Sequence, residues 1–279
     1  MCNVLGVSQS AFYNFVNGKS YTPSEERLLL SFEVRQIFDF HQKRYGSLRI
    51  LEDMKELGYD IGIYKIRSLM KEQGLKAIQP KQFVPKTTQT DPSLVRSPNL
   101  LLDEKNLPKA PNKVIVGDIT YLPSKEYGYT QWLYLAVWMD LFSRKIVGWY
   151  VDEFMKESLV IMALQQVLRN RQPPKGLIVH SDGGSQYGST NFRTIIGANQ
   201  FRQSMTRKDN HYDNAHVESL FSRFKAEVLD QGIFQGLENA RFRVFEYIEG
   251  YYNTIRRHSA CGQISPNKFE EQFWNNYNI

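Results

Sequence analysis

The stretch WLYLAVWMDLFSRKIVGWYV, residues 132–151, reads as two apolar strands joined by a tight turn at Phe142–Ser143. Both halves are rich in the aromatic and β-branched residues that favour strands. Two strands joined by a tight turn run antiparallel, so this stretch predicts that a sheet contains an antiparallel pair here. Asp140 ends the first strand just before the turn, where we expect it to cap backbone N–H groups.

Strands and helices alternate on both sides of this hairpin. The run KVIVGDITYL (113–122) predicts a strand that ends at Asp118, and KGLIVHSDGGSQY (175–187) predicts a strand that delivers Asp182 into a glycine loop. The remaining elements are helices at 156–170 and 189–198, a short strand at 201–205 and a polar loop at 206–213. An antiparallel start followed by this alternation predicts an α/β fold, a mixed sheet with helices on both faces.

The stretch DNAHVESLFSRFKAE (213–227) predicts an amphipathic helix. Glu218 lies beside its apolar stripe and not on the opposite face, and Lys225 follows two turns later on nearly the same side. A single Glu at such a boundary usually reaches out to water, and a lysine there is usually solvated. The stripe consists of Val217, Leu220, Phe221, Phe224 and Val228.

The chain changes character along its length. Residues 1–80 read as a helical DNA-binding region, with a partial helix-turn-helix at 1–20 and a helix-turn-helix-like unit at 45–76 that Ser47 caps. Its charges alone fit any helical bundle equally well. The first helix of the partial unit is expected to lie before Met1. The segment 81–112 is rich in Pro, Thr, Ser and Asn and predicts a linker. A catalytic core at 113–235 and a basic helical tail at 236–279 follow.

Composition sets the outer limits. The chain has 279 residues, which predicts two domains, and its formal net charge of +6 weakly favours an anionic partner such as nucleic acid. Two cysteines, Cys2 and Cys261, exclude a disulfide framework and a cysteine zinc cluster and fit a reducing compartment. The apolar run at 132–139 is too short to span a bilayer, and no secretory signal is visible. We therefore expect a soluble cytoplasmic protein that does not act at a membrane.

Three carboxylates suggest the chemistry. Asp118 and Asp182 end strands, and strand ends in an open α/β sheet converge on one crevice, toward which the helix can point Glu218. Such a group would repel itself unless a cation occupied its centre. Mg²⁺ suits oxygen ligands, and paired ions about 3.5–4 Å apart can activate one oxygen and stabilise another during phosphodiester displacement. A single Asp at a strand end is more often a turn or cap residue, so spacing alone leaves this alternative open.

The chain also resembles a known family. The segments GDITYL (117–122), YLAVWMDLFSRKIVGW (134–149), HSDGGSQYGS (180–189), MTRKDNHYDNAHVESLFSRFKAE (205–227) and YNTIRRHSACGQISPNKFE (252–270) resemble the OrfB-type transposases of bacterial insertion sequences of the IS-three type. The helical stretch 45–77 resembles the helix-turn-helix region that precedes the integrase catalytic core in that family.

This resemblance implies a ribonuclease-H-like (RNase H-like) fold with a DDE triad. Asp118, Asp182 and Glu218 are then the catalytic, metal-binding residues, with two Mg²⁺ ions for which Mn²⁺ can substitute. Lys225 resembles the basic residue that contacts the element's end. The implied reaction is cleavage of one strand at the element end, followed by attack of its 3′-hydroxyl on other DNA, with no covalent protein–DNA intermediate.

The implied partners are double-stranded DNA, both the insertion-sequence ends and the target, and a second copy of the chain, since joining two ends needs at least a dimer. The product of an upstream reading frame is a further possible partner, as a fusion, and the chain is expected on the nucleoid when DNA-bound. His180 is interpreted as a donor that supports Asp182; with His211 and His216 it matches no zinc-finger spacing. Further DNA contacts are predicted at Lys65, Arg67, Arg207, Lys208, Arg256 and Arg257, while Lys81, Lys86 and Arg96 of the linker could track a DNA backbone.

The sequence departs from the family's pattern at three positions. Ile115 replaces a usual tryptophan, Gly117 a usual polar residue and Asp209 a usual glycine; we interpret the first two as packing changes and Asp209 as a solvated loop tip. One alternative function is a catalytically silent DNA-binding regulator at element ends. A retroviral-type integrase is expected to have an N-terminal zinc module of two histidines and two cysteines, which the cysteines of this chain exclude. A simple ribonuclease H has no use for the helical region and basic tail.

Overall fold

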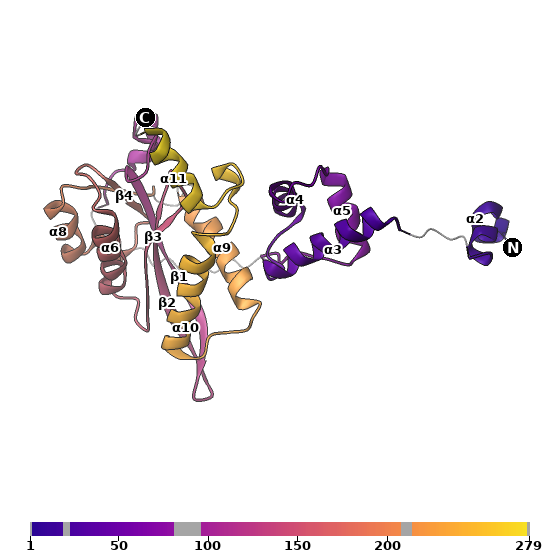
Figure 1. The fold of residues 1–279 in the computed structure, drawn as a ribbon. Helices are drawn as coiled ribbons and strands as arrows, with labels where there is room; N and C mark the ends of the chain where they lie inside the picture. Colours follow the sequence, from indigo (N-terminus) through magenta and orange to yellow (C-terminus); the bar gives the residue numbers. More distant parts are fainter. Residues whose placement is uncertain (1, 19–22, 81–95, 208–213, 278–279) are drawn as a thin grey trace. The chain divides into compact units, whose positions relative to one another are not determined.

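The computed structural model describes residues 2–18, 23–80, 96–207 and 214–277 (Figure 1). The chain divides into two compact units, Met1–Ile78 and Gln79–Ile279. In the part of the chain that is described, no helix combines the length and apolar character that crossing a bilayer requires.

The first unit is helical. Its helices are α1 (Cys2–Leu5), α2 (Gln9–Val16), α3 (Glu25–Phe40), α4 (Ser47–Glu56) and α5 (Ile63–Glu72). Ser8 caps α2 by accepting a hydrogen bond from Ala11 N, and Gly46, not Ser47, is the N-cap of α4. The helices α3, α4 and α5 pack together through their apolar faces, which bury Leu30, Val34, Ile37, Phe38, Ile50, Leu51, Met54, Ile66, Leu69 and Met70.

The second unit is built on a five-stranded mixed sheet, as predicted. The strands are β1 (Val114–Glu126), β2 (Tyr129–Asp140), β3 (Ile146–Asp152), β4 (Ile178–Ser181) and β5 (Arg202–Met205). They lie in the order β3-β2-β1-β4-β5, with β1, β2 and β3 antiparallel and β4 and β5 parallel to β1. The turn between β2 and β3 confirms the hairpin at 132–151.

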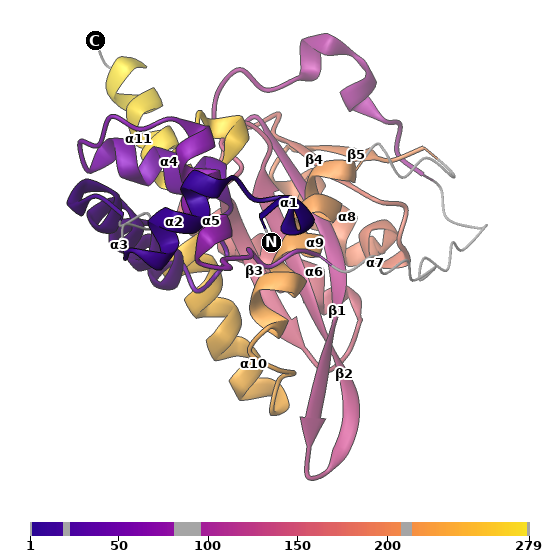
Figure 2. The ribbon, with the colours of Figure 1, turned by 90° about the vertical axis from the view of Figure 1, so that its right-hand side faces the viewer.

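The strand β1, which forms a hairpin with β2, is longer than the sequence predicts. The expected first strand ends at Asp118, but β1 continues through Pro123 to Glu126 and turns at Tyr127 and Gly128, both with positive φ. Such values match the tight turns that suit twisted strands. The hairpin projects beyond the other strands (Figure 2), and Tyr127 at its tip is 92% exposed.

Helices cover both faces of the sheet (Figure 1). The helices α6 (Glu157–Arg171), α7 (Ser185–Gly188) and α8 (Thr190–Ala198) belong to one side, where α6 packs on β2 and β3. The helices α9 (Ala215–Leu229) and α10 (Gly236–Phe245) pack against β1 from the other side. The chain continues through a π-helix (Glu246–Tyr252) to α11 (Pro266–Tyr277). Side chains alternate along β1, so Ile115 joins the core under α6 while Asp118 points to the α9 side.

Gly117 and Ile115 are packing positions, as interpreted from the sequence. A Cβ atom on Gly117 would lie 2.4 Å from the Trp138 ring, so only glycine leaves room for this buried indole. The ring stacks on Phe192 with centroids 6.0 Å apart and meets Tyr187 edge to face at 5.7 Å. Ile115 is fully enclosed in the same cluster. These closely packed side chains support β1 on the face of the sheet opposite Asp118.

Candidate active site

The sheet register brings the two aspartates together. The parallel pairing of β1 with β4 covers Val114 to Gly117 and ends at the Gly117–Ser181 pair, so Asp118 and Asp182 are each the next residue. Asp118 is therefore not at the end of its own strand, as the sequence suggests, but at the end of its pairing with β4. The two side chains share the carboxyl edge of β4, which is where ligands bind in open α/β sheets.

The electrostatics link these aspartates to the helical glutamate. Burial raises the pKa of Asp118 well above its usual value, and the negative charges of Asp182 and Glu218 raise it further. The hydrogen bond from Ile119 N to Asp118 Oδ1, at 2.8 Å, and the charge of Lys225 act in the opposite direction. Three carboxylates from three separate elements therefore influence one site.

Neighbouring groups partly offset the effect of burial on the Asp182 carboxylate. Burial raises the pKa of Asp182, while a hydrogen bond from Gly184 N and the positive charge of Arg96 lower it. The distance from Gly184 N to Asp182 Oδ1 is 3.0 Å. This bond fixes the carboxylate at the start of the glycine loop.

The helix α9 presents Glu218 and Lys225 as the sequence pattern suggests. Its apolar stripe is buried, while Glu218 in the first turn is exposed beside buried Val217. Lys225 is half-buried, and burial lowers its pKa while the charge of Asp118 raises it. The ammonium group of Lys225 thus lies within electrostatic reach of the Asp118 carboxylate.

Within the described ranges, no three His, Cys, Asp or Glu side chains form a cluster ready to hold a metal ion. The groups that influence one another at this site nevertheless all offer carboxylate oxygens, the donors that Mg²⁺ prefers. Their mutual repulsion is what a divalent cation would relieve. The donor chemistry therefore fits a magnesium site.

Two further residues border the carboxylates and were not singled out from the sequence. Asn214 is buried before α9; its Nδ2 donates to Gly117 O at 3.4 Å, and its Oδ1 has no hydrogen-bond partner among the residues that the structure describes. Tyr187 is buried under the glycine loop, and burial together with the charges of Asp182 and Asp118 raises its pKa well above its usual value. An aromatic residue within an otherwise polar loop is the only sequence signal for Tyr187.

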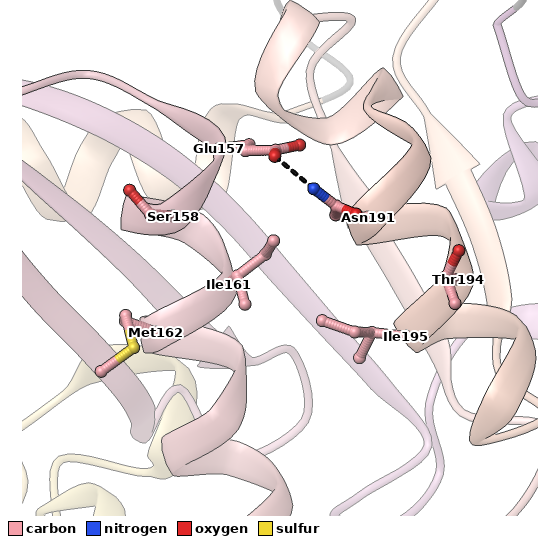
Figure 3. Close-up of a pocket in the computed structure, with 7 residues that line it drawn as sticks. All are labelled: Glu157, Ser158, Ile161, Met162, Asn191, Thr194 and Ile195. Atoms are coloured by element: carbon pink, nitrogen blue, oxygen red, sulfur yellow. Dashed lines mark hydrogen bonds between the residues drawn. The ribbon is translucent and has the colours of Figure 1, made fainter.

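A separate surface pocket lies between α6 and α8 (Figure 3). It is shallow, with a volume of about 440 Å³, and Glu157 accepts a hydrogen bond from Asn191 Nδ2 across its rim at 2.6 Å. None of the three carboxylates lines it. Its lining is Glu157, Ser158, Ile161, Met162, Asn191, Thr194 and Ile195.

Comparisons with known proteins identify the family of the chain. Models described as "Integrase core domain" match residues 108–211 and 199–266, and one described as "HTH-like domain" matches residues 23–83. The chain is 39% identical to an IS600 insertion-element protein of Shigella sonnei, over 98% of both chains. It is 35% identical to the transposase InsF of insertion sequence IS3 from Escherichia coli, over 98% of this chain and 93% of that one. The chain belongs to the IS3-type transposase family.

The fold class and the enzyme class follow from this membership. The second unit of the transposase is the RNase H-like integrase core, and the enzyme is a DDE-type polynucleotidyl transferase, as the resemblance implied. A transposase of insertion sequence IS904 from Lactococcus lactis is also 39% identical, over 88% of this chain and 95% of that one. Among solved structures, a chain of the simian T-cell lymphotropic virus intasome aligns with a TM-score of 0.49 and 15% identity, over 85% of this chain and 74% of that one.

Two predicted DNA contacts in the transposase are corrected. Arg256 and Arg257 are 3% and 7% exposed, and Arg256 forms an ion pair of 2.6 Å with Glu227 of α9. Arg257 Nη1 donates to Gln263 O at 2.7 Å. These guanidinium groups hold the chain after the π-helix in place, so the two arginines are interior although the neighbouring Thr254 and Ile255 are exposed.

The other basic residues stand at the surface of their own units. Arg207 and Arg67 are exposed and Lys65 is half-buried, while Lys208 lies outside the described residues. The linker lysines Lys81 and Lys86 also fall outside them, as do His211 and Asp209. Arg96, however, is described, and it lies at the active site.

His180 and Asp140 have structural partners in the transposase. His180 is buried in β4, and its Nδ1 lies 2.8 Å from Ser204 Oγ in β5. Its identified contact therefore supports the strand that leads to Asp182. The expected capping role of Asp140 is confirmed, because its carboxylate accepts hydrogen bonds from Phe142 N, Ser143 N and Asn112 N.

Proposed function

We propose that this transposase cuts one DNA strand at the end of an insertion sequence and transfers the new 3′-hydroxyl into other DNA, in a reaction that depends on Mg²⁺. One observation carries the proposal. Burial raises the pKa of Asp118, and the charges of Asp182 and Glu218 raise it further, so two other carboxylates act on a buried aspartate at the edge of the integrase core. Crowded carboxylates call for a cation at neutral pH.

Asp118, Asp182 and Glu218 are the residues that would hold Mg²⁺ through their oxygens. When bound, a pair of such ions stabilises charge on the attacking and leaving oxygens, and Mn²⁺ is a suitable substitute. In the first step water attacks phosphorus and the bond to the 3′-oxygen breaks, which frees a 3′-hydroxyl. In the second step this hydroxyl attacks a target phosphorus, a new phosphodiester forms and the target's 3′-oxygen leaves. No bond between protein and DNA is made.

The test uses a duplex that carries the element end. Asp118→Asn, Asp182→Asn and Glu218→Gln are expected to abolish Mg²⁺-dependent nicking and strand transfer while leaving binding to the end intact. Glu153→Gln is the matched control, because Glu153 is an exposed carboxylate after β3 and outside the triad. Robust nicking by any triad variant would contradict the assignment. End binding without nicking by the unaltered chain would favour a silent DNA-binding regulator.

Lys225 is proposed to contact a phosphate of the element end. Its ammonium group is half-buried and within the field of Asp118, so it can reach DNA that enters the site. Lys225→Ala is expected to weaken end binding and to reduce the slope of log K against log salt concentration by about one. Filter binding or fluorescence anisotropy over a salt series measures both quantities. An unchanged slope would exclude a phosphate contact at Lys225.

The remaining contacts are proposed by position. Arg67 and Lys65 on α5 and Arg207 before α9 offer cations to DNA phosphates, which bind through charge without reading sequence. Because two ends must be joined, we propose a dimer or a larger assembly on DNA. We place the reaction on the nucleoid in the bacterial cytoplasm.

A further inference from the structure

The segment that leads into the integrase core runs along the outer edge of β5. Ser97 Oγ donates to Gln203 Oε1 at 3.0 Å, and Leu100 N donates to Ser204 Oγ at 2.9 Å. Both partners lie in β5, and the same Ser204 hydroxyl contacts His180 of β4. The segment is therefore hydrogen-bonded to the strand beside the one that leads to Asp182. Because Arg96 directly precedes Ser97, these bonds also hold the backbone of Arg96 in place.

The guanidinium of Arg96 lies against the glycine loop. A Cβ atom on Gly183 would be 2.3 Å from Arg96 Nη2 and 2.4 Å from Cζ, so the guanidinium occupies the space that a side chain would fill. The φ angle of Gly183 is not in the left-handed region, so what the missing Cβ provides here is room for the guanidinium and not a special backbone conformation. Gly183 directly follows the catalytic Asp182.

The charge of Arg96 is available for a ligand. It reaches the Asp182 carboxylate closely enough to influence it, yet within the described ranges Arg96 forms no hydrogen bond or ion pair with another residue. A guanidinium has five N–H donors in a planar fork that matches phosphate oxygens. The side chain is half-exposed, so DNA in the site can reach it.

We propose that Arg96 is a DNA-binding residue of the active site, which donates to a phosphate oxygen beside the cut bond and offsets the charge of Asp182 when DNA and metal are absent. This inference rests on the proposed function, since it assumes that DNA enters at the triad. Arg96 comes from the segment before the integrase core, so that segment completes the site from outside the sheet.

Two consequences have opposite signs. The Arg96 guanidinium and a divalent cation are both attracted to the Asp182 carboxylate and repel each other, so the charge of Arg96 weakens metal binding in the absence of DNA. The same charge strengthens binding of the phosphodiester backbone. A residue that only held the fold together would shift both affinities in the same direction.

The experiment measures Mn²⁺ binding by titration calorimetry without DNA, and end-DNA binding over a salt series. Arg96→Ala is expected to tighten Mn²⁺ binding about three- to ten-fold, to weaken end binding by a similar factor and to lower the salt slope by about one. Arg96→Lys should recover much of the salt slope because it restores the charge. Lys105→Ala is the matched control, since Lys105 is an exposed cation of the same segment whose ion-pair partner is Asp103 and not a catalytic carboxylate.

Gly183→Ala tests the geometry itself. Its new methyl group would displace the Arg96 guanidinium from its place, so it should weaken end binding in the otherwise unaltered chain and have little further effect in the Arg96→Ala background. Unchanged Mn²⁺ affinity together with an unchanged salt slope in Arg96→Ala would overturn the inference. These measurements need no catalysis, so the inference about Arg96 can fail independently of the proposed function. Nicking by a triad variant would contradict the proposed function, whereas the salt slope of Arg96→Ala would still test the role of Arg96.

Discussion

Asp118 is an unfavourable residue for the stability of the metal-free chain. Its folded-state pKa lies above its unfolded value because of burial and of two neighbouring carboxylates. In the pH range between those two values the folded state binds more protons, so the free energy of unfolding falls as pH rises through the raised pKa. The same side chain that would hold metal therefore lowers stability at neutral pH.

Asp118→Asn is expected to stabilise the metal-free protein. The amide keeps the shape of the side chain and removes the repelled charge, so the melting temperature at pH 7 should rise by about 2–4 °C, the shift that ~1 kcal/mol produces in a unit of this size. Thermal unfolding in a chelator measures this. Asn at position 182 should give a smaller gain, because Gly184 N and Arg96 already compensate Asp182. A lower melting temperature for Asp118→Asn would contradict the electrostatic account.

At the level of single residues, the sequence predicts the site where local pattern controls position. Asp182 follows an apolar strand and Glu218 sits beside a helical stripe, and both patterns persist in the fold. Arg256 could not be placed this way, because its partner Glu227 lies 29 residues earlier in the chain. Arg96 is similar, since only the packing on Gly183 reveals its place.

Among the elements, α9 depends on a buried ion pair. Glu227 and Arg256 are both nearly inaccessible, and Glu227 also accepts a hydrogen bond from Tyr247 at 2.8 Å. Removing one partner leaves an uncompensated charge in the interior, whereas replacing both with apolar residues often costs little. The ion pair thus links α9, which carries Glu218, to the segment that follows the π-helix.

Glu227→Gln is expected to destabilise the core unit by about 3 kcal/mol, since it strands the Arg256 charge in a buried place. The double variant Glu227→Met with Arg256→Met should recover most of that loss. Urea unfolding of the single and double variants measures the coupling. Equal stability of the single variant and the unaltered chain would show that the pair contributes nothing to the folded state.

The lengths of the elements were harder to predict than their order. The expected first strand ends at Asp118, and Pro123 lacks the N–H that a strand residue donates, so the sequence gives no sign that β1 extends past it. In the fold, Pro123 offers its carbonyl to Phe234 N at 3.1 Å, and Lys125 N donates back to Phe234 O, so the strand continues. The segment before α10 supplies this support from more than a hundred residues away.

Across the whole molecule, two units with separate cores share one chain. The boundary lies between Ile78 and Gln79, and the sheet with its covering helices belongs wholly to the second unit. The sequence predicts such a division from a change in composition near residue 80. The helical unit and the integrase core match different family models.

We expect residues 79–279 to fold without the helical unit. The fragment should show one cooperative thermal transition and a far-ultraviolet spectrum of mixed helix and strand. It should bind element ends more weakly and with less preference over unrelated DNA, because the HTH-like region is missing. Competition binding against random duplex measures that preference. A fragment that fails to fold, or one that keeps full preference, would contradict this division of labour.

The segment before the core also has a consequence for solubility. As the last strand of the sheet, β5 would offer unpaired N–H and C=O groups to any passing chain, which makes such borders templates for aggregation. Residues 97–100 occupy that border, and Met205 N donates to Pro98 O there. A core trimmed to begin at residue 113 would lose this cover and self-associate at high concentration, so expression trials gain from keeping it.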